Sequence, residues 1–171
     1  EGGPSGRATP LGSIVIAAYD RARLVGKAVR SGLAQTHGTI EVIVSDDASP
    51  DDSVAVLRAI DDPRLRIHAQ ATNVGVWKNW TAALRLARGE FVVFLGDDDF
   101  LDENFVERHV EVFAACPGVS ALFCPLAGLS PDGTVQWILE QPFPVGVPAP
   151  ASAIVAKLLA NRLFVGSAMF P

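Results

Sequence analysis

Three adjacent acidic residues, Asp97, Asp98 and Asp99, follow the apolar stretch 91–95 almost directly, after a single glycine. Adjacent carboxylates repel one another, and the pKa of at least one of them rises unless a cation or strong hydrogen-bond donors neutralise the charge. Hard oxygen ligands of this kind suit Mg²⁺ or Mn²⁺, and Mg²⁺ is usually held by one or two carboxylates together with substrate phosphates. The run therefore predicts a metal site; the alternative is a solvated acidic loop that caps the next helix.

A second set of polar residues has the chemistry to recognise a nucleotide base. Tyr19 follows the apolar run 13–18, and Asp46 and Asp47 follow the run 40–45. An aspartate can accept a hydrogen bond from the N–H group of a base, and an aromatic ring beside it can stack on that base. Both features also have a structural interpretation, because aspartates commonly form turns or cap helices and aromatic rings commonly pack. The residues alone leave both interpretations open.

The elements that position these residues alternate between short apolar runs and amphipathic segments. This alternation predicts an α/β fold with a mostly parallel central sheet flanked by helices. The expected strands cover residues 13–18, 40–45, 65–69 and 91–95, and the expected helices cover about 24–33, 51–60, 76–88 and 105–116. In such sheets ligands bind at the carboxyl ends of the strands, so the polar residues are expected to meet at one edge.

The third expected helix, 76–88, carries a stripe of apolar residues. The spacing predicts that Trp77, Trp80, Leu84 and Ala87 share one face, and Gly89 stands where a C-terminal cap is expected.

The last third of the chain gives weaker signals. The turn-forming run 130–133 lies between two strand candidates, 120–125 and 134–139, and predicts a β-hairpin. A Pro-rich loop at 141–150, a helix at 152–161 and a final strand at 163–170 are expected after it.

The composition narrows the class of protein. The 171 residues are enough for one domain with a full core, and the formal net charge of −5 gives no reason to expect a nucleic acid as partner. Residues 1–12, rich in Gly and Pro, are expected to form a mobile leader or an expression remnant. Cys116 and Cys124 indicate no disulfide framework, and no apolar run approaches the roughly 20 residues that span a bilayer. We therefore expect a cytoplasmic protein, with association at the inner face of the membrane left open.

Absent motifs narrow the chemistry further. The sequence contains no GxxxxGK[ST] loop, no GxGxxG after the first strand and no GxSxG. These absences disfavour P-loop nucleotidases, dinucleotide oxidoreductases and α/β-hydrolases. A base pocket beside a metal-carboxylate site remains, and this pairing suits an activated nucleotide conjugate whose diphosphate leaves.

Several ordered segments resemble glycosyltransferase family 2. They are SIVIAAYD at 13–20, EVIVSDDASPDDS at 41–53 and NVGVWKNWTAALRLARGEFVVFLGDDDF at 73–100. The resemblance implies a GT-A fold, with residues 13–171 forming a nucleotide-sugar-binding domain whose acceptor-binding part is incomplete. It also implies metal-dependent, inverting transfer from a nucleoside diphosphate sugar, with a UDP-sugar favoured and Mn²⁺ or Mg²⁺ as cofactor. The acceptor is a glycan, a lipid-linked molecule or a protein.

The resemblance also assigns roles at the base. Ala17 is expected to approach the base through its backbone, Tyr19 to stack on it or flank it, and Asp47 to accept its N–H. Lys78 precedes Asn79 where relatives often carry Arg, and it either steadies the base or diphosphate or is a solvated helix residue.

The acidic run takes the remaining roles that the resemblance implies. Asp97 is expected to contact the ribose or the metal's shell, and Asp98 to coordinate the cation. Asp99 is the second metal candidate, because Gly96 replaces the first aspartate of many relatives and shifts the register of the motif.

The resemblance places the general base outside these 171 residues. The base is expected beyond Pro171, in the acceptor-binding half, so no catalytic residue is assigned. A non-catalytic nucleotide-sugar-binding module is therefore the main alternative. A nucleotidylyltransferase is disfavoured because its Gly-rich, Arg-containing loop is missing.

Overall fold

The structure, a computed structural model, describes residues 9–130, 132–139 and 168–170. The elements in chain order are β1 (Gly12–Ala18), α1 (Val25–Leu33), β2 (Ile40–Asp46), α2 (Ser53–Arg58), β3 (Leu65–Ala69), α3 (Val76–Leu86), β4 (Phe91–Gly96), α4 (Phe105–Ala115), β5 (Leu122–Phe123), β6 (Leu126–Leu129), β7 (Val135–Leu139) and β8 (Ala168–Phe170). No helix within the described ranges is long and apolar enough to cross a bilayer.

Several predicted features of the last third lie outside the described residues. They are the loop expected at 141–150, the helix at 152–161 and residues 163–167 of the expected last strand. Pro171, beyond which the general base is expected, also lies outside them. The structure therefore does not test the prediction about the base.

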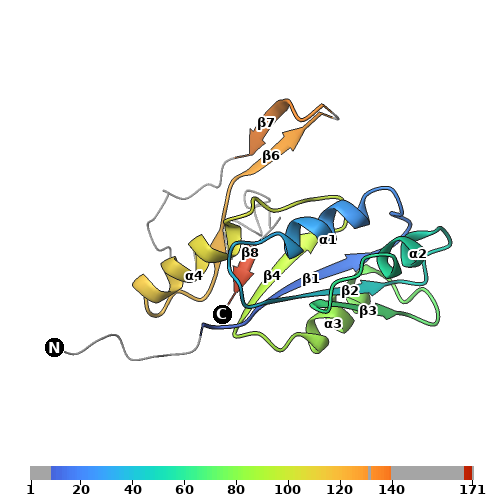
Figure 1. The fold of residues 1–171 in the computed structure, drawn as a ribbon, viewed down its shortest axis with the longest axis horizontal. Coiled ribbons are helices and arrows are strands. Elements are labelled where there is room, and N and C mark those ends of the chain that lie inside the picture. Colours follow the sequence, from blue (N-terminus) through green and yellow to red (C-terminus); the bar gives the residue numbers. More distant parts are fainter. Residues whose placement is uncertain (1–8, 131, 140–167, 171) are drawn as a thin grey trace.

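The main sheet has the strand order β3-β2-β1-β4-β8-β5. The first four strands in this order run parallel, and β8 pairs antiparallel with β4 and with β5 (Figure 1). The four parallel strands were each predicted to within one residue at either end. The predicted α/β fold with a mostly parallel central sheet is therefore confirmed.

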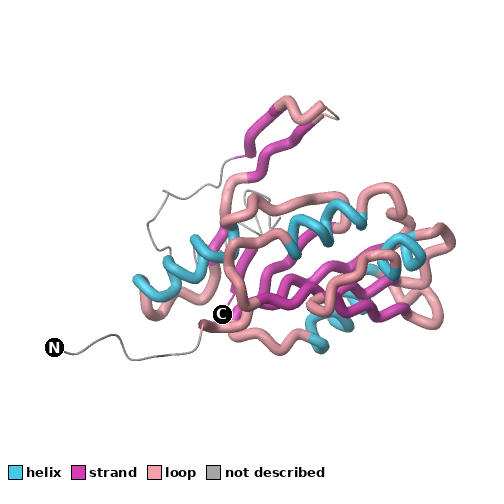
Figure 2. The backbone as a smooth tube through the Cα atoms, in the orientation of Figure 1, coloured by secondary structure: helices cyan, strands magenta, loops and turns pink. Residues whose placement is uncertain are grey.

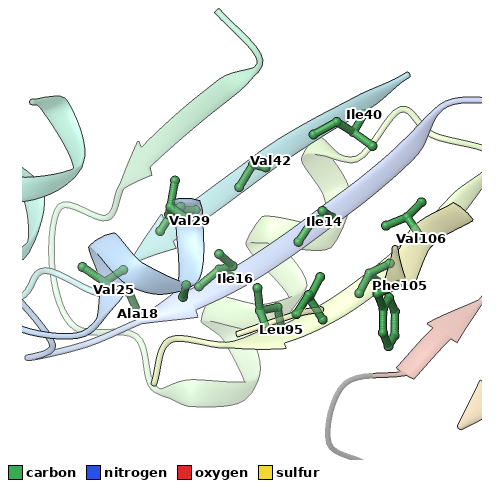
Figure 3. Close-up of a cluster of buried hydrophobic side chains, with 14 of the residues drawn as sticks. Ile14, Ile16, Ala18, Val25, Val29, Ile40, Val42, Leu95, Phe105 and Val106 are labelled. Carbon is green, nitrogen blue, oxygen red and sulfur yellow. The ribbon is translucent and has the colours of Figure 1, made fainter. Parts of the chain in front are cut away.

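The core lies on both faces of β1, because successive residues of a strand point to opposite faces. Ile14 and Ile16 pack with Val29 of α1 on one face (Figure 3), and Val15 packs with Ala83 of α3 on the other. These side chains are fully buried, and each Ile or Val among them contributes about 1.5 to 3 kcal/mol through its removal from water. Burial on both faces explains why the strand has a continuous apolar run and no alternation.

The apolar stripe predicted for α3 packs against the sheet only in part, through Trp80 and Ala87. Trp77 and Leu84 are exposed, at 82% and 41%, and the buried positions are Asn79 and Ala83. The polar Asn79 is tolerated there because its Nδ2 donates to the carbonyl oxygen of Ser45 at 2.8 Å. An apolar pattern has no means of identifying a polar residue as buried, and this was the source of the error.

The prediction that Gly89 caps α3 was also wrong. The helix ends at Leu86 and is followed by Ala87 in an extended conformation. Gly89 lies against β1, where an added Cβ would stand 2.7 Å from the carbonyl oxygen of Leu11 and 2.7 Å from the nitrogen of Ser13. The glycine is needed for this close approach of two backbones.

The predicted hairpin exists, but its first strand was placed wrongly. At the expected turn the N–H of Ser130 donates to the carbonyl oxygen of Thr134, and the N–H of Gly133 donates to the carbonyl oxygen of Ser130. The strand paired with β7 is β6, whereas β5, inside the predicted 120–125, joins the main sheet. A short turn can only pair the segments that flank it directly, which the prediction overlooked. Figure 2 shows this hairpin standing apart from the main sheet.

Ala48, in the loop after β2, has a left-handed backbone conformation with φ of 56°. This conformation costs a residue with a Cβ about 1 to 2 kcal/mol, and glycine avoids most of that cost. We expect Ala48→Gly to increase the free energy of unfolding by about 0.5 to 1 kcal/mol in denaturant titrations. Ala55→Gly, at an exposed position of α2, is the control and should lower it by a similar amount. Equal losses in both variants would contradict the expectation.

Candidate functional site

Parallel pairing places the carboxyl ends of β1, β2 and β4 side by side. Ala17 is aligned with Ser45 of β2 and with Gly96 of β4. The residues that follow these positions therefore meet at one edge of the sheet, as expected for ligand-binding residues of this fold class.

A cavity of about 350 Å³ opens at this edge. It is lined by Ala17, Ala18, Tyr19, Arg21, Asp47, Asn73, Gly75, Val76, Asn79, Trp80, Gly96 and Asp97. Four of the five residues predicted to bind the nucleotide sugar are among them. The fifth, Lys78, is exposed on α3 and does not line this cavity.

Asp47 holds the loop that leads into α3. Its side chain is buried, and its two carboxylate oxygens accept the N–H groups of Val74 at 2.7 Å and Gly75 at 2.9 Å. Asp46 is a turn former, because its carboxylate accepts the N–H and the hydroxyl of Ser49. Each Asp47 oxygen retains a second lone pair, so the carboxylate keeps the capacity to accept a further donor from the cavity.

Asp97 is tied to the loop between β1 and α1. Its Oδ2 accepts the N–H of Tyr19 at 3.2 Å, and its Oδ1 lies 3.8 Å from the Nε of Arg21. Tyr19 is 46% exposed, so the residue is accessible to a ligand. These contacts link the expected base-binding residue to the acidic run.

Arg21 and the Tyr19 N–H offset the negative charge of the acidic run only in part. Burial raises the pKa of Asp97, and the charge of Asp98 raises it further, against the lowering effect of the Tyr19 N–H and Arg21. The Asp99 side chain is exposed as a whole, but partial desolvation of its carboxyl group and the charge of Asp98 raise its pKa as well. Raised pKa values in a group of carboxylates indicate a place where a cation would be stabilised.

Gly96 allows the carboxylates to fold back over the end of β4. A Cβ at this position would lie 2.7 Å from Oδ2 of Asp99 and 3.3 Å from Oδ1 of Asp98. The replacement of an aspartate by glycine, seen in the sequence as a departure from the usual motif, thus leaves room for the two metal candidates. Carboxylate oxygens of Asp98 and Asp99 therefore both lie close to the backbone of Gly96.

These carboxylates fit a divalent cation only with additional ligands. No three His, Cys, Asp or Glu side chains within the described ranges gather closely enough to bind a metal ion by themselves. Mg²⁺ and Mn²⁺ accept carboxylate and phosphate oxygens, and Mg²⁺ usually takes one or two carboxylates plus phosphates. The donor set therefore fits a cation that arrives with a diphosphate.

A second cavity, of about 670 Å³, adjoins the first. It is lined by Asp20, Arg21, Ala22, Arg23, Leu24, Pro50, Asp51, Asp52 and Asp98. Arg21 lines both cavities, and the sequence interpretation missed it. The sequence feature that could have identified it is a positively charged side chain two residues after Tyr19, just beyond the first strand.

Asn79 is the second residue that the sequence interpretation missed. Its Nδ2 joins the ends of two strands by donating to the carbonyl oxygens of Ala18 and Ser45. Its Oδ1 is buried and has no partner among the residues that the structure describes. An unpaired buried acceptor costs roughly 1 to 3 kcal/mol, so a donor that reached it would be bound favourably.

Comparison with known proteins identifies the class. The family description "Glycosyl transferase family 2" matches residues 13–142. This family match, together with the mostly parallel central sheet, identifies the domain as a GT-A fold of the glycosyltransferases. The chain belongs to glycosyltransferase family 2.

Individual relatives show how much of a longer protein the chain represents. The succinoglycan biosynthesis protein ExoO of Rhizobium meliloti (strain 1021) is 37% identical over 99 residues, which are 58% of this chain and 28% of that protein. The structure of S. aureus TarS 1-349 in complex with UDP-GlcNAc has a TM-score of 0.65 at 23% identity, covering 73% of this chain and 37% of that one. Mannosyltransferase PcManGT from Pyrobaculum calidifontis, in complex with GDP-Man and Mn2+, has a TM-score of 0.65 at 20% identity, covering 98% and 46%. The chain thus spans less than half the length of each.

The raised pKa of Asp99 has a consequence for stability in the metal-free protein. A carboxyl group whose pKa is higher in the folded state contributes most at low pH, and that contribution is lost as the pH rises through the folded-state pKa. We therefore expect Asp99→Asn, in the presence of a chelator, to raise the melting temperature at pH 7. The corresponding increase in the free energy of unfolding should stay below about 1 kcal/mol because the Asp99 side chain is exposed. It should shrink as the pH approaches the ordinary aspartate value of 3.8.

Asp132→Asn is the control of opposite sign. The hydroxyl of Ser130 and the N–H of Thr134 lower the pKa of Asp132 to about 2. Ionised Asp132 therefore stabilises the folded protein at neutral pH, and Asp132→Asn should lower the melting temperature at pH 7. Shifts in the same direction for both variants would contradict the destabilisation that partial burial and the charge of Asp98 impose on ionised Asp99.

Proposed function

We propose that this domain binds a nucleoside diphosphate sugar together with a divalent cation and transfers the sugar to an acceptor hydroxyl with inversion. The observation that carries the proposal is the convergence of three strand ends on one cavity, with Tyr19 and Asp47 on one side and Asp97 beside the acidic run. The alternative is a module of the same binding specificity that transfers nothing.

The base is assigned to the smaller cavity. The exposed residue Tyr19 would offer a stacking surface, Asp47 an acceptor for a base N–H, and Ala17, which also lines this cavity, would approach the base through its backbone. A uracil base, whose ring carries one N–H donor between two carbonyl groups, suits an acceptor of this kind. The solved structure of TarS with UDP-GlcNAc, which has the same fold, supports a UDP-sugar as the favoured donor.

The diphosphate is assigned to the border between the two cavities. Arg21 lines both cavities there, and its guanidinium is free to pair with a phosphate as well as with Asp97. Lys78, on the exposed side of α3, is a second cation for the base or diphosphate.

Asp98 and Asp99 would hold the divalent cation, and Asp97 would contact the ribose or the cation's shell. Mn²⁺ in the related fold of PcManGT supports this assignment, and Mg²⁺ has the same ligand preference. When bound, the cation would neutralise negative charge on the departing diphosphate.

The proposed reaction is a single displacement. The acceptor oxygen forms a bond to the anomeric carbon while the bond from that carbon to the diphosphate oxygen breaks, and the acceptor proton passes to a general base. The residues of this domain bind the donor and hold its leaving group in line, which lowers the entropy cost of the step. No residue of the described ranges is assigned as the base, and its position beyond Pro171 stays a prediction. A polysaccharide acceptor is favoured by the similarity to a succinoglycan biosynthesis protein.

Calorimetric titration tests the proposal. UDP and GDP are titrated with Mn²⁺, with Mg²⁺ and with a chelator, and we expect micromolar binding of one of them that needs the cation. Asp98→Ala should weaken this binding by roughly 10- to 100-fold, because it removes a cation ligand. Asp61→Ala, which removes the same charge from an exposed residue that lines neither cavity, should leave it unchanged.

Binding that is equally strong with chelator, and unaffected by Asp98→Ala, would contradict the cation assignment. Sugar transfer from the preferred donor by the full-length protein, measured by release of the nucleoside diphosphate, separates the enzyme from the binding module.

A further inference from the structure

The acidic segment 97–103 runs alongside helix α1 and is held by it at several points. At one end Asp97 accepts the N–H of Tyr19, just before the helix. At the other end the N–H of Thr36, just after the helix, donates to the carbonyl oxygen of Glu103 at 2.8 Å. The segment is therefore fixed at both ends by residues that flank α1.

Between these ends a stripe of three residues, two in α1 and one just after it, contacts the segment. Lys27 and Ser31 are four residues apart, so they lie on one face of α1, and Gln35 follows two residues after the end of the helix. The Nζ of Lys27 stands 4.1 Å from the centre of the Phe100 ring, and the hydroxyl of Ser31 accepts the N–H of Leu101 at 3.1 Å. These contacts begin directly after Asp99.

Gln35 extends the stripe to the start of α4. Its side chain is buried, and its Nε2 donates to the carbonyl oxygen of Asp102 at 2.8 Å. Its Oε1 accepts the N–H of Val106 at 2.9 Å, in the first turn of α4. Helix α4 has no side-chain cap from its own N-cap residue, Asn104, so Gln35 supplies a partner for one of its free N–H groups.

We propose that Lys27, Ser31 and Gln35 are positioning residues that set the affinity of the site for the cation and the diphosphate. The three aspartates repel one another, and a free loop would let them move apart. Because the stripe holds the backbone on the C-terminal side of the aspartates, the carboxylates stay close together before any ligand arrives. Binding then requires less ordering of the loop, and affinity rises accordingly. This inference rests on the proposed function of the same site.

Ser31→Ala is the principal test, in the full chain, with Mn²⁺ and the nucleoside diphosphate that the unmodified protein binds. We expect roughly fivefold to tenfold weaker binding of the diphosphate, in the range found when groups that orient metal ligands are removed. Binding of the corresponding nucleoside, which lacks phosphates, should be unchanged. Ser31→Thr keeps the hydroxyl and should restore the affinity.

Hydrogen exchange in the metal-free protein gives a readout that does not depend on a ligand. The N–H of Leu101 should exchange faster in Ser31→Ala than in the unmodified protein, because its acceptor is gone. Thr81→Val is the matched control, since the Thr81 hydroxyl donates to the carbonyl oxygen of Trp77 within its own helix, α3. Lys27→Met, at an exposed position, provides a second variant that leaves the core intact and should weaken diphosphate binding by a smaller factor.

Unchanged diphosphate affinity in both Ser31→Ala and Lys27→Met would overturn the inference while the proposed function stands. Equal weakening of nucleoside and diphosphate binding would also overturn it, because this pattern indicates a general structural effect. An unmodified protein that binds no nucleoside diphosphate with any cation would overturn the proposed function, and the inference about affinity with it.

Discussion

The pairing of β1 between β2 and β4 is the constraint on which the rest of the structure depends. Both edges of β1 are occupied by parallel neighbours, and both of its faces are covered by apolar side chains. The register that results places Tyr19, Asp47 and Asp97 beside one another although 78 residues separate the first from the last. Asn79 reinforces the arrangement by bonding to the ends of β1 and β2. A binding cavity thus follows from the way the core is packed.

The carboxylates at the end of β4 lower the stability of the folded, metal-free protein. Burial and the charge of Asp98 raise the pKa values of Asp97 and Asp99, so ionisation of these two groups destabilises the folded, metal-free protein slightly at neutral pH. Two features keep them together all the same: Gly96 leaves space beneath Asp98 and Asp99, and α1 holds the segment that follows. Groups that destabilise a free protein are often the ones that bind a ligand, because the ligand relieves the strain.

The sequence predicted the features that depend on local patterns, and missed those that depend on contacts between distant segments. The four parallel strands were found from their apolar runs, and Asp46 acts as the turn former that its type suggests. The buried Asn79 escaped notice because its partners are backbone carbonyls of two strands. Gly89 was taken for a helix cap because nothing in the sequence shows that the backbone of β1 passes within van der Waals distance. The role of Gln35 depends on residues 67 and 71 positions away, and no local pattern reports it.

The central claim is that the cavity between the strand ends holds a base while the acidic run holds a cation. Diffraction from crystals grown with UDP and Mn²⁺, recorded at the manganese absorption edge, tests it directly. The account predicts an anomalous peak within coordination distance of Asp98 or Asp99, about 2.0 to 2.3 Å, and in contact with the diphosphate. It also predicts a uracil ring against Tyr19 with its N–H directed at Asp47. A nucleotide bound away from these residues, or manganese that avoids both aspartates, would contradict it.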